Sequence, residues 1–120
     1  MATYSDLEVY KRSYRLAIEL HNFSLTLPKY LQFDLADQIR RASRSIPSGI
    51  AEGYARKQSS RDTLTFLNRA QGSLDEVLFN IEFMKDINLI IEKKYKYFFE
   101  EYTICSKQLT NLIRSIVVSK

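Results

Sequence analysis

Glycine and proline are scarce in this chain, with three glycines and two prolines among 120 residues. An all-β protein needs many turns, so this composition disfavours a sheet fold. Long apolar runs are also missing, because no stretch approaches the roughly 20 residues of a membrane span. The N-terminal stretch MATYSDLEVYKR contains no apolar signal core. These absences predict a helical cytoplasmic protein that does not bind a membrane.

The residue types that most often bind metals or act as nucleophiles are nearly absent. A single cysteine, Cys105, excludes an internal disulfide and a multi-cysteine metal site. The single histidine, His21, lies on an apolar stripe and is interpreted as a core or interface residue. No Glu-x-x-His pair and no glycine-rich phosphate loop occurs. We therefore expect no enzyme, no metal site and no cofactor.

Hydrophobic periodicity predicts four long helices joined by short connections. Short connections place consecutive helices antiparallel. The expected fold is all-α, a single up-down-up-down four-helix bundle domain over residues 1–120. The predicted helices cover about 5–27, 32–56, 59–86 and 91 to near the C-terminus.

Local signals refine the ends and faces of these helices. Ser5 and Glu8 have the spacing of a capping box, and Ser59 or Ser60 is a suitable N-cap. The last helix carries a heptad seam in which apolar residues alternate spacings of 4 and 3. That seam consists of Ile91, Tyr95, Phe98, Tyr102, Cys105, Leu109, Leu112 and Ile116.

Pro47 lies in the middle of the second predicted helix. Proline has no N–H and its ring crowds the carbonyl four residues back, so the helix is predicted to be kinked or broken there. Gly49 and Gly53 follow and are assigned a structural role with Pro47, because glycine lets another backbone come close.

The first helix has two apolar stripes, although a helix in a simple bundle buries only one. One contains Leu7, Tyr10, Tyr14, Ala17, Ile18 and Leu25, and the other Val9, Leu16, Leu20, Phe23 and Leu27. Phe79 and Phe83, and Tyr97 and Ile104, also lie off the main stripes. The surplus favours a homo-oligomer or an obligate partner over a splayed bundle that covers both stripes within one chain. The predicted oligomer interface is Val9, Leu16, Leu20, Phe23, Phe79 and Phe83.

Charge is unevenly distributed along the chain. The net charge is +4 overall, but residues 38–69 carry +5 and residues 70–104 carry −3. Arginine suits phosphate because its planar fork donates two hydrogen bonds at once. The alternative is that these residues solvate a face or pair with acids, as Glu52 could with Arg56. The candidate nucleic-acid-binding residues are Arg40, Arg41, Arg44, Arg56, Lys57, Arg61 and Arg69.

Several segments together resemble the four-helix bundle proteins encoded in intervening sequences of bacterial 23S rRNA genes, also called S23 ribosomal proteins. These are similar to the accessory variability protein of diversity-generating retroelements. The chain departs from the family pattern at Gly49, where asparagine is typical. The matching segments are Asp6–Tyr10, Gln38–Ala42, Ser45–Ser48, Ile50–Gly53, Phe66–Leu67, Ala70, Gly72–Leu74 and Glu76.

The resemblance implies a ring-like homopentamer with a basic surface. The retroelement relative is understood to bind its reverse transcriptase and nucleic acid, so the resemblance implies partners of these kinds. Our first hypothesis is a non-enzymatic, homo-oligomeric bundle that binds RNA or DNA. The second is a scaffold for a protein partner, such as a reverse transcriptase or a ribonucleoprotein, in which the arginines are structural.

Overall fold

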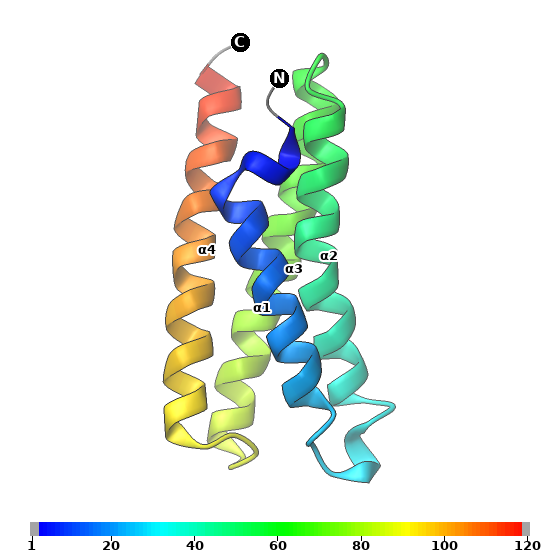
Figure 1. Ribbon diagram of the computed structural model, residues 1–120, viewed down its shortest axis with the longest axis vertical. Coiled ribbons are helices and arrows are strands. Elements are labelled where there is room, and N and C mark those ends of the chain that lie inside the picture. The colour runs from blue at the N-terminus through cyan, green and yellow to red at the C-terminus, as the bar shows by residue number, and fades with distance from the viewer. Residues whose placement is uncertain (1–2, 119–120) are drawn as a thin grey trace.

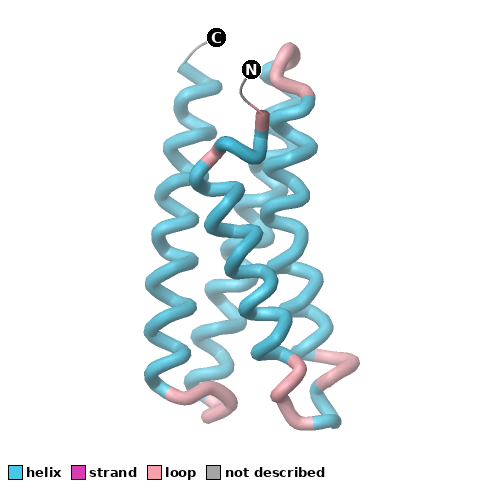
Figure 2. Tube along the Cα trace, in the orientation of Figure 1, coloured by secondary structure: helices cyan, strands magenta, loops and turns pink. Residues whose placement is uncertain are grey.

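The fold is a bundle of four α-helices, seen in a computed structural model that describes residues 3–118, with side chains up to residue 116. No strand occurs within this described part, as Figure 2 shows. The bundle measures 46 × 24 × 21 Å. The elements are η1 (Tyr4–Asp6), α1 (Glu8–Ser24), η2 (Lys29–Leu31), α2 (Leu35–Ala55), α3 (Ser60–Asp86) and α4 (Glu92–Val118).

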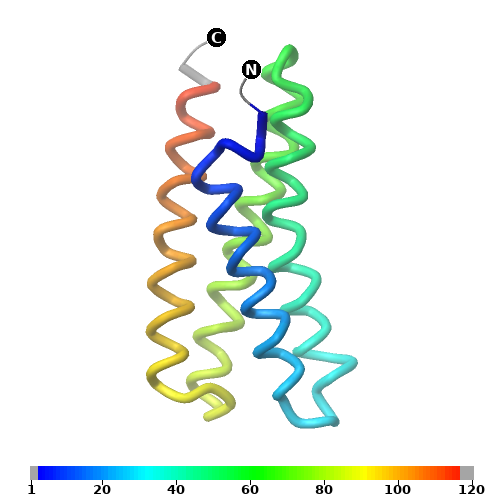
Figure 3. Tube along the Cα trace, viewed as in Figure 1, coloured from blue at the N-terminus to red at the C-terminus, as the bar shows by residue number. Residues whose placement is uncertain are grey.

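Consecutive helices run antiparallel, which confirms the predicted all-α bundle (Figure 1). In the packing order, α1 contacts α2 and α4, whereas α3 contacts α2 and α4 and lies diagonally opposite α1. The α2–α3 connection lies at the same end of the molecule as the start of α1, and the α3–α4 connection lies at the other end (Figure 3). None of the described helices is long and apolar enough to cross a bilayer.

The core is built from the apolar stripe that each helix turns inward. On α1 this stripe holds Val9, Leu16 and Leu20, which are buried within one chain. On α4 the predicted seam is buried or half-buried from Tyr95 to Ile116. Ile91 is the exception at 63% exposed, because it lies in the connection before α4 begins.

The two helices at the start of the chain are shorter than predicted. The capping box predicted at Ser5 and Glu8 is wrong, because residues 4–6 form a separate turn in which the Thr3 N–H donates to Asp6 Oδ2 at 2.9 Å. α1 ends at Ser24 rather than near Leu27. The α1–α2 connection contains its own short helix, so α2 starts at Leu35.

Pro47 does not break α2, so of the two predicted outcomes the break is wrong. Residues Leu35–Ala55 form one continuous helix with Pro47 inside it. Neighbouring serines donate to carbonyls of the preceding turn, Ser43 Oγ to Arg40 O at 3.2 Å and Ser45 Oγ to Ala42 O at 2.9 Å, but neither bond reaches the Ser43 carbonyl that Pro47 deprives of its helical donor. Pro47 is buried against the rest of the bundle, so tertiary packing offsets the missing hydrogen bond.

The glycines of α2 and α3 give a matched pair of stability predictions. A Cβ at Gly49 would lie 3.2 Å from both Ala70 Cβ and Phe66 O, whereas one at Gly72 would meet nothing within 4 Å. Overpacking costs about 1–3 kcal/mol, more than the 0.5–1 kcal/mol that alanine gains over glycine in a helix. We expect Gly49→Ala to lower the free energy of unfolding in urea and Gly72→Ala to raise it. Equal effects of the two substitutions would contradict the close approach of α2 to α3.

Candidate functional site

The seven basic residues singled out in the sequence do not form one surface. Six lie on or beside α2 and at the start of α3, and Arg69 lies further along α3. Arg40 and Arg56 are 16 residues apart, about 24 Å along a helix. The structure therefore divides the set into a group on α2, formed by Arg40, Arg41 and Arg44, and a group at the α2–α3 connection.

Arg40 is a structural residue. Its Nη1 donates to Ser24 Oγ at 2.9 Å and to Gln32 Oε1 at 3.1 Å, and its Nη2 donates to the Gln32 carbonyl at 2.7 Å. Gln32 Nε2 in turn donates to the carbonyls of Ser24 and Leu27. The half-buried guanidinium thus fixes the α1–α2 connection, which does not fit its predicted role as a phosphate contact.

The other two arginines of this group are exposed and face different neighbours. Arg41 forms an ion pair with Asp37 one turn earlier, Nε to Oδ2 at 3.2 Å. It lies beside Ser73 and Glu76 of α3. Arg44 lies on the α1 side of the helix and forms no ion pair within the described residues. Of the three, Arg44 is the exposed arginine whose guanidinium is not held in an ion pair within the described residues.

At the α2–α3 connection, cations gather around an aromatic ring. The guanidinium carbon of Arg56 lies 4.5 Å from the Phe66 ring centroid, and that of Arg69 lies 5.4 Å from it. Lys57 Nζ lies 4.8 Å from the Tyr54 ring centroid. All the cations here are exposed, including Arg61 at the start of α3. We call this cluster the basic end; it consists of Tyr54, Arg56, Lys57, Arg61, Phe66 and Arg69.

The charge pattern of the sequence indicated the cations of the basic end but not its two rings. The signal was the spacing of Tyr54 before Arg56 and Lys57, and of Phe66 three residues before Arg69. The sequence left open an ion pair between Glu52 and Arg56, and the structure shows a different contact. Arg56 Nη1 instead donates to the Glu52 carbonyl at 2.9 Å.

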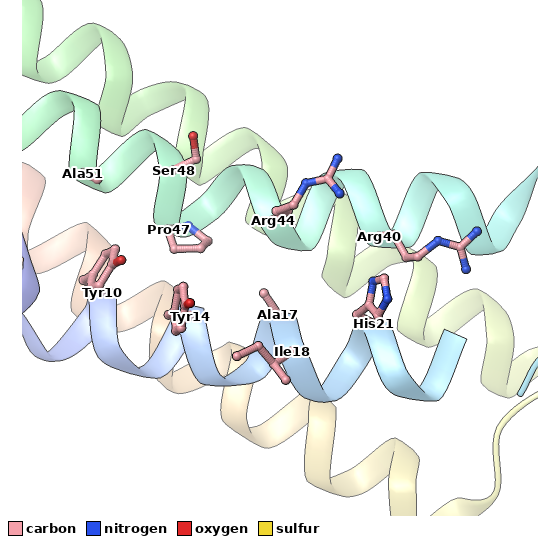
Figure 4. A pocket seen from close by; sticks show the side chains of 10 residues that line it. All are labelled: Tyr10, Tyr14, Ala17, Ile18, His21, Arg40, Arg44, Pro47, Ser48 and Ala51. Atoms are coloured by element: carbon pink, nitrogen blue, oxygen red, sulfur yellow. The ribbon is translucent and has the colours of Figure 1, made fainter. Parts of the chain in front are cut away.

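A groove of about 450 Å³ runs between α1 and α2 (Figure 4). Its floor is made of small side chains, among them Ala17 and Ala51. His21 and Arg40 lie at one end of the groove in Figure 4, and Tyr10 lies toward the other. We call this the α1–α2 groove; it is lined by Tyr10, Tyr14, Ala17, Ile18, His21, Arg40, Arg44, Pro47, Ser48 and Ala51.

The surplus apolar surface lies on the face of α1 opposite to the one predicted. Val9, Leu16 and Leu20 were expected at an oligomer interface, but they are at most 4% exposed within one chain. Phe23 is half-buried and packs on the core beside Phe98. The exposed stripe is the other one, with Tyr14 at 52%, Ile18 at 51% and Leu25 at 58% exposed. The periodicity of the sequence indicates both stripes, but nothing in the sequence distinguishes the stripe that faces the core.

Two further residues of the predicted interface are exposed, as expected. Phe79 is 67% and Phe83 45% exposed, and their rings stack at a centroid distance of 6.3 Å. Tyr97 and Ile104 are exposed as well. A single chain therefore leaves large apolar side chains uncovered on α1, α3 and α4.

His21 and Cys105 do not form a catalytic site. His21 is exposed beside the groove rather than buried in the core. Cys105 is fully buried, and burial raises the pKa of its thiol to about 12, so it stays protonated and unreactive at neutral pH. Among the described residues, no group of three or more histidines, cysteines and carboxylates is placed to hold a metal ion.

A carboxylate on α4 joins α1 to α4. Glu101 Oε1 accepts from Arg12 Nη1 and from Arg15 Nη2, both at 2.7 Å. Hydrogen bonds from Arg15 and then Arg12 hold the pKa of the Glu101 carboxyl below its ordinary value of 4.5. A lowered folded-state pKa contributes stability above the ordinary value, and this contribution is lost as the pH falls through the folded-state pKa.

We expect Glu101→Gln to lower the free energy of unfolding at pH 7 by about 1–2 kcal/mol, a value reduced by the partial exposure of Arg15. The gap between variant and parent should narrow as the pH falls below about 4.5, since protonation removes the same charge from the parent. Urea unfolding of parent and variant from pH 7 to pH 3 measures the difference in free energy of unfolding and its change with pH. A gap that stays constant over this range would show that the ion pairs do not contribute.

Comparison with known proteins identifies the family. A family model described as 23S rRNA-intervening sequence protein matches residues 5–111. The crystal structure of a protein with unknown function from the S23 ribosomal protein family of Bacteroides thetaiotaomicron VPI-5482 is similar, with a TM-score of 0.80 and 25% sequence identity over 88% of this chain and 95% of that chain. No match was found among curated proteins. Because the family model spans most of its length, the chain belongs to the 23S rRNA-intervening sequence protein family.

Proposed function

We propose that this protein is a non-enzymatic, homo-oligomeric bundle of the cytoplasm that binds single-stranded nucleic acid at the basic end. The observation that carries the proposal is the placement of Arg56 and Arg69 over the Phe66 ring, with Lys57 and Arg61 exposed nearby. Arg40 belongs to the α1–α2 connection and is not part of this proposed surface.

The chemistry of the basic end suits a single strand better than a rigid duplex. Cationic side chains attract phosphates, and exposed aromatic rings or guanidinium planes let bases stack. Here exposed guanidinium groups lie over the half-buried Phe66 ring, at the α2–α3 connection and on the first turns of α3. Such binding tolerates many sequences, because every base has a π face.

Self-association would place several basic ends on one particle. The exposed apolar side chains of α1 and α3 support it, since a patch of this kind on a soluble protein marks an interaction site. Linked basic ends would bind one long RNA with more affinity than a single end.

The experiment is a titration of a fluorescently labelled single-stranded RNA with the full chain at low salt, followed by anisotropy. Saturable binding that an unlabelled RNA competes away is the expected result. No change in anisotropy at protein concentrations up to 100 µM, about the limit of nonspecific binding, would contradict the proposal.

The α1–α2 groove favours a second candidate function, a scaffold for a protein partner. The groove combines an apolar floor with Arg44 and His21, the kind of surface that accepts an amphipathic acidic helix. In that case a protein partner would stay bound at a salt concentration that releases RNA, and nuclease treatment would not remove it.

A further inference from the structure

The α1–α2 groove is an apolar surface with positive charge, and no other segment of residues 3–118 fills it. Tyr14 and Ile18 on its α1 side are about half exposed. Arg44 forms no ion pair within the described residues, and His21, which lines the same groove, is exposed. From Arg40 to Ala51 the α2 wall spans 11 residues, about 16 Å of helix.

The complementary surface lies on α3 of the same chain. Phe79 and Phe83 are exposed one turn apart, with their rings stacked. Asp75, Glu76 and Asp86 are exposed, and at 100° per residue they fall within about 60° of Phe79 around the helix. Asp75 and Glu76 form no ion pair within the described residues. We call this the α3 acidic face; it consists of Asp75, Glu76, Phe79, Phe83 and Asp86.

Gly72 lies on the same side of α3 and is also exposed. Nothing lies within 4 Å of where its Cβ would be, so no packing inside the chain requires a glycine. An interior helix glycine costs about 0.5–1 kcal/mol relative to alanine. A glycine here would let the backbone of another molecule come close to α3.

The two surfaces match in length, shape and charge. Asp75 and Asp86 are 11 residues apart, the same span as the α2 wall of the groove. The stacked rings of Phe79 and Phe83 suit a hollow lined by the small side chains of Ala17 and Ala51. The carboxylates beside these rings would face Arg44 and His21 of the groove. We infer that the α3 acidic face of one copy docks in the α1–α2 groove of a second copy.

This inference rests on the oligomeric part of the proposed function and specifies its contact. Because α3 lies diagonally opposite α1, the groove and the acidic face are different surfaces of each chain. A contact between two different surfaces is heterologous, so each copy uses both and the assembly closes into a ring or continues as a filament. In this contact Arg44 of one copy faces carboxylates of the α3 acidic face of the next, and this opposite charge fixes the direction of assembly.

A complementation experiment tests the contact. Ile18→Glu places a carboxylate in the groove and leaves the acidic face intact, and Phe79→Glu does the reverse. Each variant alone should have the 14.1 kDa mass of one chain by light scattering. An equimolar mixture should form a heterodimer of twice that mass and stop there, because only one intact groove and one intact acidic face remain to meet.

Two matched substitutions control for the loss of an exposed apolar side chain. Phe33→Glu in the α1–α2 connection and Ile91→Glu before α4 replace residues 96% and 63% exposed that lie outside both surfaces. Both should keep the parent mass. Circular dichroism and thermal unfolding of all four variants check the fold, and Ile18→Ala and Phe79→Ala replace any variant that does not fold.

The outcomes separate this contact from the proposed function. A parent that associates while Ile18→Glu or Phe79→Glu remains oligomeric overturns the contact and leaves the oligomer intact. A parent that is monomeric at 100 µM, about a hundredfold above a micromolar Kd, overturns the contact and the oligomer together. The monomeric variants keep the basic end, so their RNA binding tests that surface independently of the contact. If neither the parent nor any variant binds RNA, nucleic-acid binding is contradicted and the contact is not.

Discussion

Replacing Arg61 and Arg69 with glutamate lowers the affinity for single-stranded RNA about 100-fold, or about 2.8 kcal/mol at 1.4 kcal/mol per tenfold. Both side chains are exposed, so reversing them removes two phosphate contacts and adds two repulsive charges. Arg61 is in the first turn of α3, where glutamate interacts favourably with the helix dipole, so the fold should be retained. Anisotropy titrations of parent and variant at one salt concentration measure the difference.

The matched control changes the same total charge at the other end of the bundle. Lys93→Glu with Lys94→Glu reverses two exposed lysines at the start of α4, which lies opposite the α2–α3 connection (Figure 1). We expect this pair to weaken RNA binding less than fivefold, through the general field alone. Equal losses in the two double variants would show that net charge, and not the basic end, governs binding.

Arg40→Ala lowers the free energy of unfolding by about 2–4 kcal/mol, since three hydrogen bonds from a charged group are lost. The substitution leaves the amide oxygen of Gln32 and the hydroxyl of the buried Ser24 without their cationic donor. Arg44→Ala, one turn later on an exposed position, should change the free energy of unfolding by less than about 0.5 kcal/mol.

Urea unfolding of both variants gives these values, and the RNA titration adds a second comparison. Arg40→Ala should bind RNA as the parent does at temperatures where it remains folded. If Arg40→Ala were as stable as Arg44→Ala and bound RNA weakly, Arg40 would be a phosphate contact and not a structural residue.

The helical architecture follows from sequence because it depends on periodicity, which is local. Ser59 caps α3 as its position predicts, accepting a hydrogen bond from the Asp62 N–H at 3.3 Å. The seam of α4 is correct for the same reason, apart from Ile91, which precedes the helix. The continuous helix through Pro47 was not predictable, because packing against neighbouring helices outweighs the local cost of proline.

The candidate site was harder to predict because it depends on which side of each helix faces inward. Both stripes of α1 are apolar, and only the packing of the other three helices buries Leu16 and exposes Ile18. Likewise, the sequence does not distinguish the roles of the seven cations, because those roles depend on contacts made only in the folded chain. Arg40 reaches the α1–α2 connection and Arg56 reaches Phe66, and no spacing rule distinguishes these two outcomes.

The most direct test of nucleic-acid binding at the basic end is the salt dependence of RNA affinity for the parent chain. Each neutralised phosphate of a single strand contributes about −0.7 to the slope of log affinity against log salt concentration. Four cations of the basic end therefore predict a linear fall with a slope of about −3 for each protein chain bound. A slope near zero, or no binding at low salt, would contradict the account.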